Sequence, residues 1–254
     1  MTHYVISYSG GKASFTAAAR AVEYAGAENV TLVFADTMIE DDDLYRFIRE
    51  GADVLGAELV WLQDGRTPWE VFEDVKYIGN SRVAPCSRVL KTDQVRDWLK
   101  ANCDPAETVL CLGISSEEYE RLERAQANWP SWTLDAPLCW RPWFSQVDVD
   151  ACLWRYGLRQ PRLYSLGYVH NNCGGFCVRG GKGQFSQLLQ HFPDRYWFHE
   201  KEMERVMESV PNTRPFLRDF RGGEVEYITL RAFREEIEAN PQQIDLLSTA
   251  GGCG

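Results

Sequence analysis

A glycine-rich turn near the start of the chain has the residue types of an anion-binding loop. Residues 7–14, Ser-Tyr-Ser-Gly-Gly-Lys-Ala-Ser, follow a short apolar run and precede an alanine-rich stretch. Adjacent glycines let the backbone approach an anion closely, and the start of a helix supplies free N–H groups and positive dipole. A glycine-rich turn that binds nothing is the alternative. The predicted ligands are Ser7, Ser9, Gly10, Gly11, Lys12 and Ser14, with Lys12 also catalytic.

Cysteines form the second group of residues suited to chemistry. Cys173 and Cys177 bracket Gly-Gly-Phe, Cys86 follows a proline, and Cys253 lies in a Gly-Gly-Cys-Gly end. Thiolates on a glycine-rich loop beside positive charge suit a soft metal or an iron–sulfur cluster. A structural zinc site and unliganded thiols are the alternatives. Three further cysteines stand in apolar or helical surroundings and are predicted to fill the core: Cys103, Cys111 and Cys152.

The charge distribution predicts a second anion site. The net charge of −10 argues against a protein that coats nucleic acid, yet residues 151–193 contain no acidic residue. A chance fluctuation on a solvated face is the alternative. Because Arg179 and Lys182 follow Cys177 on a glycine-rich segment, we expect them to bind an anion. The other basic residues of this window are Arg155, Arg159, Arg162, His170 and His191.

Composition narrows the class of protein. Hydrophobic residues make up 44% of 254 residues and charged residues 25%, which is typical of a globular protein. No run approaches the roughly 20 apolar residues needed to cross a bilayer, and residues 1–7 do not resemble a signal peptide. We therefore expect a cytoplasmic protein without a membrane partner. Eight cysteines in such a chain favour metal or redox chemistry over a disulfide framework.

The elements that must position these residues alternate between strand and helix. Apolar runs predict strands at 4–8, 30–35, 57–61 and 108–112, and periodic stretches predict helices up to about Tyr24, at 42–55 and at 91–102. This alternation predicts an α/β fold with a parallel sheet and right-handed crossovers. Ligands of such sheets bind at the carboxyl ends of the strands. Ser9, Asp36 and Gly113 are all predicted to lie there.

The pattern changes after about Trp132. Prolines interrupt the chain, glycine-rich loops follow, and helices resume at about 194–209 and 230–239. We predict two domains: a nucleotide-binding α/β domain at 1–135 and a helical, cysteine-bearing region at 136–254. The second is expected to pack on the active edge of the first.

Several motifs together resemble a known family. The turn resembles the PP-loop, S-G-G-x-D-S, of ATP pyrophosphatases, with Ala13 where that pattern has aspartate. The segments at 34–47, 85–91, 112–124 and 163–168 resemble, in order, motifs of the phosphoadenosine phosphosulfate reductase family. The resemblance covers about residues 4–205. It implies the Rossmann-like fold of the adenine nucleotide α-hydrolases, a parallel sheet flanked by helices.

The resemblance also implies a cofactor. In the iron–sulfur adenylyl-sulfate reductases, cluster cysteines lie at positions matching Cys86, Cys173 and Cys177, so a [4Fe–4S] cluster is expected, with zinc as the alternative. Two departures weaken the match: Cys86 stands alone where the family has a doublet, and the pair is C-x3-C rather than C-x2-C. The fourth ligand is Cys253, Cys139 or an exogenous group.

Other predicted site residues bind the nucleotide. Asp36 is expected to accept hydrogen bonds from adenosine hydroxyls or to hold a cation such as Mg²⁺, whereas the acids at 40–43 fit a helix N-terminus equally well. Arg88 and Lys91 lie three residues apart and suit a phosphate or sulfate clamp, or else a solvated helix face. Gly113 is expected to let the backbone approach adenine.

Three functions follow. In the first, the enzyme binds ATP, adenylates an acceptor and supports iron–sulfur-dependent sulfur transfer. In the second, it reduces adenylyl sulfate or its 3′-phosphorylated form, with Cys253 as the nucleophile. In the third, it is a non-catalytic module that binds a nucleotide or nucleic acid and keeps a structural metal. The expected partners are an adenine nucleotide, a sulfur acceptor that includes nucleic acids among the candidates, and a sulfur- or electron-donor protein.

Overall fold

The chain folds into two compact units, each assembled from separate segments. The computed structural model describes residues 2–221 and 224–240. The first unit contains the chain up to Asp36, Asp42–Gln63 and Asp93–Arg162. The second contains Thr37–Asp41, Asp64–Thr92 and the described chain from Leu163 onward. The two predicted domains, 1–135 and 136–254, are each one continuous segment, whereas each compact unit combines several segments. The predicted domain boundary at residue 135 therefore stays a prediction.

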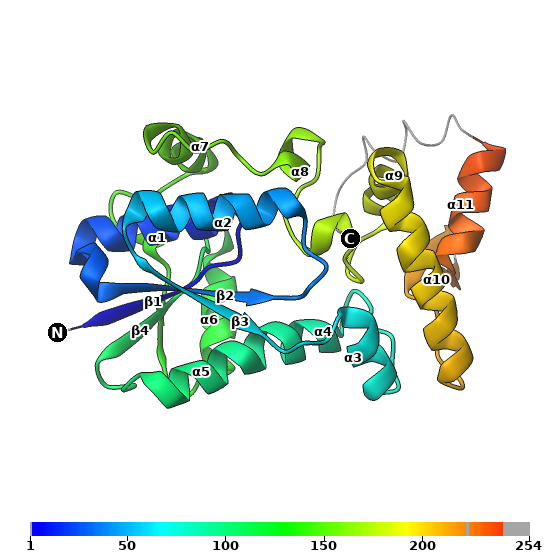
Figure 1. Cartoon of the computed structure of the whole chain (residues 1–254), viewed down its shortest axis with the longest axis horizontal. Helices are drawn as coiled ribbons and strands as arrows, with labels where there is room; N and C mark the ends of the chain where they lie inside the picture. Colours follow the sequence, from blue (N-terminus) through cyan, green and yellow to red (C-terminus); the bar gives the residue numbers. More distant parts are fainter. Residues whose placement is uncertain (1, 222–223, 241–254) are drawn as a thin grey trace. The chain divides into compact units, whose positions relative to one another are not determined.

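A five-stranded parallel sheet forms the centre of the first unit (Figure 1). The strand order is β3-β2-β1-β4-β5. The chain runs outward from β1 through β2 to β3 and then returns to the other side of β1, so the topological switch point lies between β1 and β4. The strands are β1 His3–Ser7, β2 Val30–Asp36, β3 Glu58–Gln63, β4 Thr108–Cys111 and β5 Thr133–Asp135.

Helices cover both faces of this sheet (Figure 1). Side chains of successive strand residues point to opposite faces, so Ile6 packs with Phe15 and Phe47 of α1 and α2, while Val5 packs with Leu99 of α5. The helices are α1 Lys12–Ala25, α2 Asp42–Leu55, α5 Gln94–Asn102, α6 Tyr119–Ala127 and α7 Gln146–Arg155, with short turns at Ala27–Asn29, Ser116–Glu118 and Pro137–Cys139.

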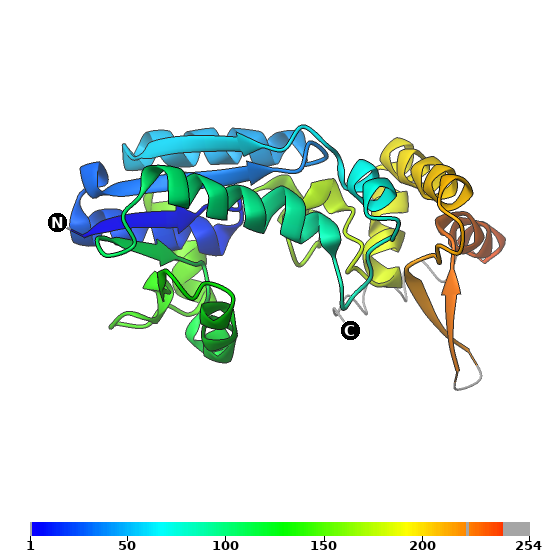
Figure 2. The ribbon, with the colours of Figure 1, turned by 90° about the horizontal axis from the view of Figure 1, so that it is seen from below.

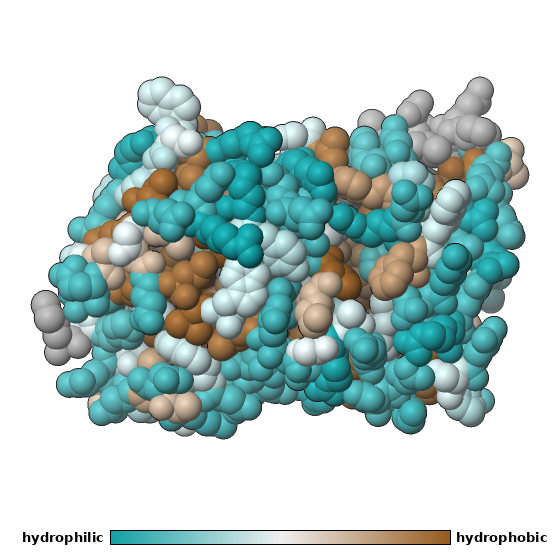
Figure 3. Space-filling model, viewed as in Figure 1, coloured by the Kyte–Doolittle hydropathy of each residue, from teal (hydrophilic) through white to brown (hydrophobic). Residues whose placement is uncertain are grey.

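The amphipathic sequence of α2 explains its position. Leu44, Phe47, Ile48 and Leu55 recur at helical spacing and are buried. The outward side of α2 is hydrophilic in the space-filling view (Figure 3). Asp42 and Asp43 occupy its first turn, where carboxylates interact favourably with the helix dipole.

The second unit is mainly helical and has its own core. Trp69, Phe176, Phe185, Tyr196 and Phe233 are almost completely buried in one cluster. An antiparallel hairpin of β6 and β7 leads into the last helix (Figure 2). The elements are α3 Pro68–Asp74, α4 Pro85–Ser87, a π-helical turn Arg88–Asp93, α8 Arg162–Ser165, a short turn Cys173–Gly175, α9 Lys182–His191, α10 Pro193–Ser209, β6 Leu217–Arg221, β7 Glu224–Ile228 and α11 Leu230–Ala239.

The predicted fold class is confirmed. The four predicted strands are β1 to β4 of the parallel sheet, and the helices at 42–55 and 230–239 have the predicted bounds. The helix expected at 91–102 begins at Gln94, because a π-helical turn precedes it. Among the described helices, none is both long enough and apolar enough to span a membrane.

Candidate functional site

The predicted anion-binding turn connects β1 to α1 in the first unit. Gly10 has φ +75°, and a Cβ at this position would lie 2.8 Å from Cγ of Leu44. The turn therefore needs glycine both for its left-handed backbone and for its contact with α2. Gly11 occupies the N-cap position of α1 in an extended conformation. The sequence thus folds locally as predicted, with a tight turn that opens directly into a helix.

The start of α1 has the properties of an anion site. It carries no side-chain cap and no acidic residue in its first turn, so no carboxylate of its own opposes an incoming anion. Ser9 is exposed, and its hydroxyl donates to Oγ of Ser14 at 3.2 Å. Ser14 in turn donates to the carbonyl of Gly11 at 2.9 Å. Both hydroxyls are therefore held in place beside the first turn of α1.

Lys12 is engaged with a carboxylate from α7. Its Nζ lies 2.6 Å from Oδ1 of Asp150, whose side chain is 54% exposed. An ion pair with such an exposed partner contributes little to stability, because water competes for both groups. A phosphate placed at the turn would compete with Asp150 for the same ammonium group. Lys12 can therefore change partners at low cost.

Gly113 lies where β4 meets α1. A Cβ on Gly113 would lie 2.7 Å from the backbone nitrogen of Ser14 and 2.9 Å from the carbonyl carbon of Ala13. The absence of a side chain therefore allows the end of β4 to touch the first turn of α1. Because β1 and β4 flank the topological switch point, the turn and Gly113 share the crevice where ligands of open α/β sheets bind.

Asp36 ends β2 and is almost completely buried. Its carboxylate accepts hydrogen bonds from Tyr45 Oη at 2.9 Å, Gln63 Nε2 at 2.8 Å and Trp61 Nε1 at 3.3 Å. These three donors account for the buried charge without a ligand. Binding of adenosine hydroxyls or of a cation by Asp36 stays a prediction.

The cysteine turn of the second unit has an unusual backbone. Cys173, Gly174 and Gly175 all have positive φ, at 49°, 58° and 88°. A left-handed conformation is unfavourable for a residue with a side chain, so Cys173 is held there by its surroundings. A Cβ on Gly174 would lie 2.6 Å from the carbonyl oxygen of Ile39, so the segment Thr37–Asp41 packs directly on this turn.

Glu40 is the buried centre of that contact. Only 1% of its side chain is exposed. Its carboxylate accepts hydrogen bonds from the hydroxyl of Thr37 at 3.0 Å, from the backbone N–H of Cys173, and from Nζ of Lys91 at 3.3 Å. One charged side chain therefore joins the Cys173 backbone to the lysine of the predicted anion clamp.

Asp41 completes the same arrangement. Its side chain is 1% exposed and lies 3.1 Å from Nη1 of Arg195 in α10. The same nitrogen donates to the carbonyl of Gly174 at 2.5 Å. The cysteine turn is thus fixed by two adjacent buried acids, through a backbone N–H on one side and an arginine on the other.

Three described cysteines of the second unit, Cys86, Cys173 and Cys177, influence one another electrostatically. Burial, with the Cys177 thiolate adding to it, raises the pKa of Cys86 to about 11. Burial and the Glu40 carboxylate raise the pKa of Cys173 well above its usual range, while Lys91 opposes this shift. Burial acts against the charge of Lys91, but Glu40 outweighs it and the pKa of Lys91 is raised. The surroundings therefore favour neutral thiols beside a charged ammonium group.

These thiols do not form a complete metal site by themselves. Within residues 2–221 and 224–240, no group of three or more histidine, cysteine, aspartate or glutamate side chains is arranged to hold a metal ion. Cys253 lies outside the described residues. Cys139 belongs to the first unit, where its thiol donates to the carbonyl of Ile114 at 3.5 Å. The predicted cluster is therefore not shown by the described residues.

The acid-free window does not form one basic surface. Its cations belong to different units, and most have acidic partners from elsewhere in the sequence. Lys182 lies 2.8 Å from Oδ1 of Asp219, and Arg155 lies 2.6 Å from Oε1 of Glu23. Arg179 is exposed and donates to the carbonyl of Ser81 at 3.2 Å. The roles predicted for Arg179 and Lys182 stay predictions, as does that of Arg88, which is exposed in the π-helical turn.

Sequence reasoning missed Glu40, Asp41 and Arg195. The four consecutive acids at 40–43 fit a helix N-terminus, and only Asp42 and Asp43 have that role. The signal that distinguishes the first two is structural: α2 begins at Asp42, so Glu40 and Asp41 precede the helix. Of the predicted core cysteines, Cys111 and Cys152 are buried, whereas Cys103 is partly exposed.

The fold and the turn define a nucleotide-binding α/β protein, and comparison with known proteins names the family. The sequence matches the phosphoadenosine phosphosulfate reductase domain over residues 3–169. Because this match covers more than half of the chain, the chain belongs to that family. Family membership supports an adenine-nucleotide-binding enzyme of the sulfonucleotide-reductase type. Cys86 lies inside the matched residues, and Cys173 and Cys177 lie beyond them.

Solved structures include similar chains, 101 of which match. One is a phosphoadenylyl-sulfate (PAPS) reductase from Candida auris in a phosphate complex. It is 14% identical, with a TM-score of 0.48, over 68% of this chain and 81% of that chain. A search of curated proteins finds no match.

Proposed function

We propose that this protein is a PP-loop enzyme that binds ATP and adenylates an acceptor for sulfur transfer. The observation that carries the proposal is the meeting of the Ser9–Ser14 turn with Gly113 at the topological switch point. An uncapped helix start, two hydroxyls and an ammonium group together offer donors for more than one phosphate. A substrate that ends in a single sulfate needs fewer donors than these.

The proposed reaction has two steps. An oxygen of the acceptor attacks the α-phosphorus of ATP, pyrophosphate leaves, and the acceptor carries AMP. A sulfur nucleophile from a donor protein then displaces AMP and forms the new carbon–sulfur bond. Lys12 would leave Asp150 and neutralise the negative charge that develops on the leaving pyrophosphate. The acceptor is a small metabolite or a nucleic acid.

We further propose that Cys86, Cys173 and Cys177 hold a [4Fe–4S] cluster, with Cys253, Cys139 or an exogenous group as the fourth ligand and zinc as the alternative metal. The support is that the thiols of the second unit are near enough to affect each other's pKa. Because the described residues do not form a complete site, we assign no step of the reaction to the metal.

A sulfonucleotide reductase is the second candidate, and the family match favours it. In this reaction a Cys253 thiolate attacks the sulfur of adenylyl sulfate or its 3′-phosphorylated form. The nucleotide leaves, and a reductant with two thiols then releases sulfite. A non-catalytic binding module is the third candidate, favoured by Ala13 in place of the aspartate of the PP-loop pattern.

Two assays on the whole chain distinguish these candidates. We expect the protein to exchange labelled pyrophosphate into ATP when small metabolites or nucleic acids that include the acceptor are present. Lys12→Ala should lose this exchange. Sulfite release from either sulfonucleotide in the presence of a dithiol reductant would instead identify a reductase. Nucleotide binding without either reaction would leave the binding module.

The cluster is tested by iron, sulfide and zinc analysis of protein purified without oxygen. We expect iron and sulfide, and loss of both when Cys86, Cys173 or Cys177 is replaced by serine. Cys253→Ser should remove the cluster if Cys253 is the fourth ligand and preserve it if Cys253 is a nucleophile. Stoichiometric zinc without iron or sulfide would contradict the cluster.

A further inference from the structure

A pocket of about 370 Å³ lies in the first unit, away from the proposed nucleotide site. Cys103 and Pro105 line it and come directly before β4, whereas Trp129–Trp132 come directly before β5. The pocket therefore lies at the amino ends of parallel strands, opposite the edge that holds the Ser9–Ser14 turn. Its volume falls within the usual range for small-molecule sites, roughly 300–1,000 Å³.

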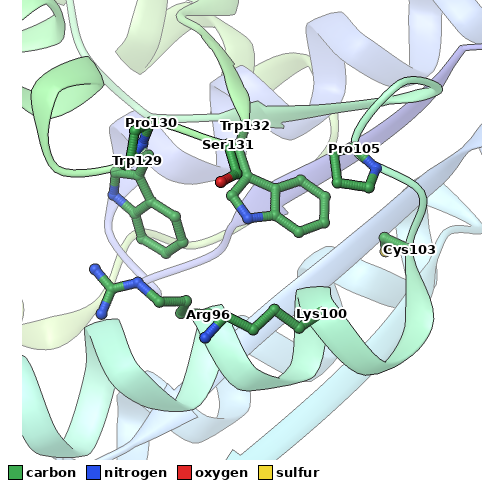
Figure 4. Close-up of a pocket in the computed structure, with 8 residues that line it drawn as sticks. All are labelled: Arg96, Lys100, Cys103, Pro105, Trp129, Pro130, Ser131 and Trp132. Carbon is green, nitrogen blue, oxygen red and sulfur yellow. The ribbon is translucent and has the colours of Figure 1, made fainter.

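Two indole rings form one wall of this pocket (Figure 4). Trp129 is 9% exposed and Trp132 is 5% exposed, and both pack with Leu99 and Leu134 in the core under the sheet. The rings are therefore fixed, and only their outer surfaces face the pocket. Immobile aromatic surfaces suit a flat apolar ring, which they can contact without losing conformational freedom of their own.

Two cations from α5 form the opposite wall (Figure 4). The guanidinium of Arg96 lies 5.0 Å from the ring centre of Trp129 and is held by Oδ1 of Asp93 at 2.8 Å. Lys100 extends back along α5, so its ammonium lies on the same side as Arg96. Its only recorded charged partner among the described residues is Asp97 at 3.6 Å, in a pair that is 62% and 75% exposed. Such a pair is readily exchanged for another anion.

The indole N–H of Trp132 adds a neutral donor. Figure 4 shows its ring nitrogen on the side that faces α5, toward the two cations. Trp132 is 5% exposed, and within residues 2–221 and 224–240 its ring nitrogen makes no hydrogen bond to protein. A buried indole usually finds an acceptor for its N–H group. Of the three donors, Arg96 bonds to Asp93 and to the carbonyl of Asn128, and Lys100 has the exposed partner Asp97, whereas the Trp132 N–H makes no hydrogen bond within the described residues.

We propose that this pocket binds a small organic anion with a flat apolar ring. The ring would lie against Trp129 and Trp132, and the anionic group would accept from Lys100 and from the indole N–H of Trp132. Both an aromatic acid and a nucleotide have this chemistry, and the site is independent of the function proposed above. The described residues that line the pocket include no acidic side chain, which is consistent with an anionic ligand.

Naphthalene-2-sulfonate serves as the probe because it combines two fused rings with one permanent charge. We expect it to shift the indole ¹H–¹⁵N signal of Trp132, identified by its loss in Trp132→Phe, and to do so saturably. Lys100→Ala should weaken binding about tenfold, since a charge-assisted hydrogen bond is lost. Lys201→Ala, an exposed lysine of α10 in the other unit, should leave the affinity unchanged. Neutral 2-naphthamide should bind more weakly than the sulfonate.

A second experiment distinguishes a nucleotide from other aromatic acids as the ligand of this pocket. If AMP shifts the Trp132 signal in the Lys12→Ala variant, the pocket accepts a nucleotide; if only the sulfonate does so, it selects other aromatic acids. The proposal is overturned if neither compound shifts this signal, or if Lys100→Ala binds the sulfonate as tightly as the parent chain.

Discussion

The two glycine-rich turns of this chain are held in opposite ways. The turn before α1 is fixed by apolar contact of Gly10 with Leu44, and no carboxylate occupies the first helical turn. The Cys173–Gly175 turn is instead fixed by the buried acids Glu40 and Asp41. At the first turn Lys12 pairs with the exposed carboxylate of Asp150, which an incoming anion can replace, whereas two buried negative charges lie at the second turn. Nucleotide phosphates therefore suit the first turn, whereas Glu40 beside the second turn opposes ionisation of the Cys173 thiol and raises its pKa.

The comparison is tested most strongly by removing the buried charge that holds the cysteine turn. Glu40→Ala leaves Lys91 and the N–H of Cys173 without their acceptor and should lower the free energy of unfolding by about 3 kcal/mol, the low end for a broken buried ion pair because Lys91 is partly exposed. Urea unfolding measures this loss. Glu40→Gln keeps an acceptor and should lose less. A loss below about 1 kcal/mol in Glu40→Ala would show that the acid does not hold the turn.

Acid pH should also affect the second unit. The imidazole of His199 stacks on Phe176, with ring centres 3.9 Å apart, and accepts from Trp69 Nε1 at 2.9 Å. Burial, together with the charge of Arg195, lowers the pKa of His199 to about 3. The unfolded chain therefore binds this proton below about pH 6.5 while the folded chain does not, so stability is lost as the pH falls from about 6.5 toward 3.

At pH 5 this loss should reach about 2 kcal/mol relative to neutral pH. Unfolding curves between pH 5 and 7.5 measure it, and His199→Gln should flatten the pH dependence because glutamine can accept from Trp69 but does not titrate. An unchanged pH dependence in His199→Gln would assign the effect to other groups.

Two glycine substitutions compare the crowded cysteine turn with a glycine that has a similar backbone conformation and free space around it. Gly174→Ala adds a Cβ that would lie 2.6 Å from the carbonyl of Ile39, whereas Gly56 has a similar φ of +63° and no atom within 4 Å. Both variants lose about 1 kcal/mol to the left-handed backbone, and Gly174→Ala should lose a further 1–2 kcal/mol or so to steric overlap. Equal losses in thermal or urea unfolding would mean that Thr37–Asp41 does not press on the turn.

The smallest expected effect on stability concerns the glycine-rich turn before α1. Lys12→Ala should weaken ATP binding about tenfold while leaving stability nearly unchanged, because its partner Asp150 is exposed. Calorimetric titration measures the affinity. Asp150→Asn should strengthen binding slightly, since the Asp150 carboxylate then no longer competes with ATP for Lys12. If both variants bind ATP like the parent chain, Lys12 does not contact the nucleotide.

The local parts of the structure could be predicted from sequence because their causes are local. The apolar runs that become β1 and β2, and the helical spacing of α2, are visible within a few residues. The turn before α1 was identified in the same way. Short helices such as α3 and α7 were missed, although a capping box marks the start of each, at Thr67–Glu70 and Ser145–Asp148.

The partners of the buried charges could not be predicted. Glu40 meets Lys91 and Cys173 across 51 and 133 positions of sequence, and Asp41 meets Arg195 across 154. The same holds for Lys182, whose acidic partner Asp219 lies outside the acid-free window that suggested a basic surface. The spacing of residues within a motif cannot predict these ion pairs and hydrogen bonds, because they depend on how distant segments of the chain pack together.

The short segment Thr37–Asp41 also has a consequence for how the protein is made on the ribosome. Its chain neighbours on both sides belong to the first unit, but Glu40 bonds to Lys91 and Cys173, and Asp41 pairs with Arg195. Glu40 and Asp41 therefore emerge long before Cys173 and Arg195, and Lys91 is the first of these distant partners to follow them. The sheet can begin to pair during synthesis, whereas the second unit must wait until more than three quarters of the chain has been translated. A chain truncated before α10 would lack Arg195 and therefore the ion pair that Arg195 makes with Asp41.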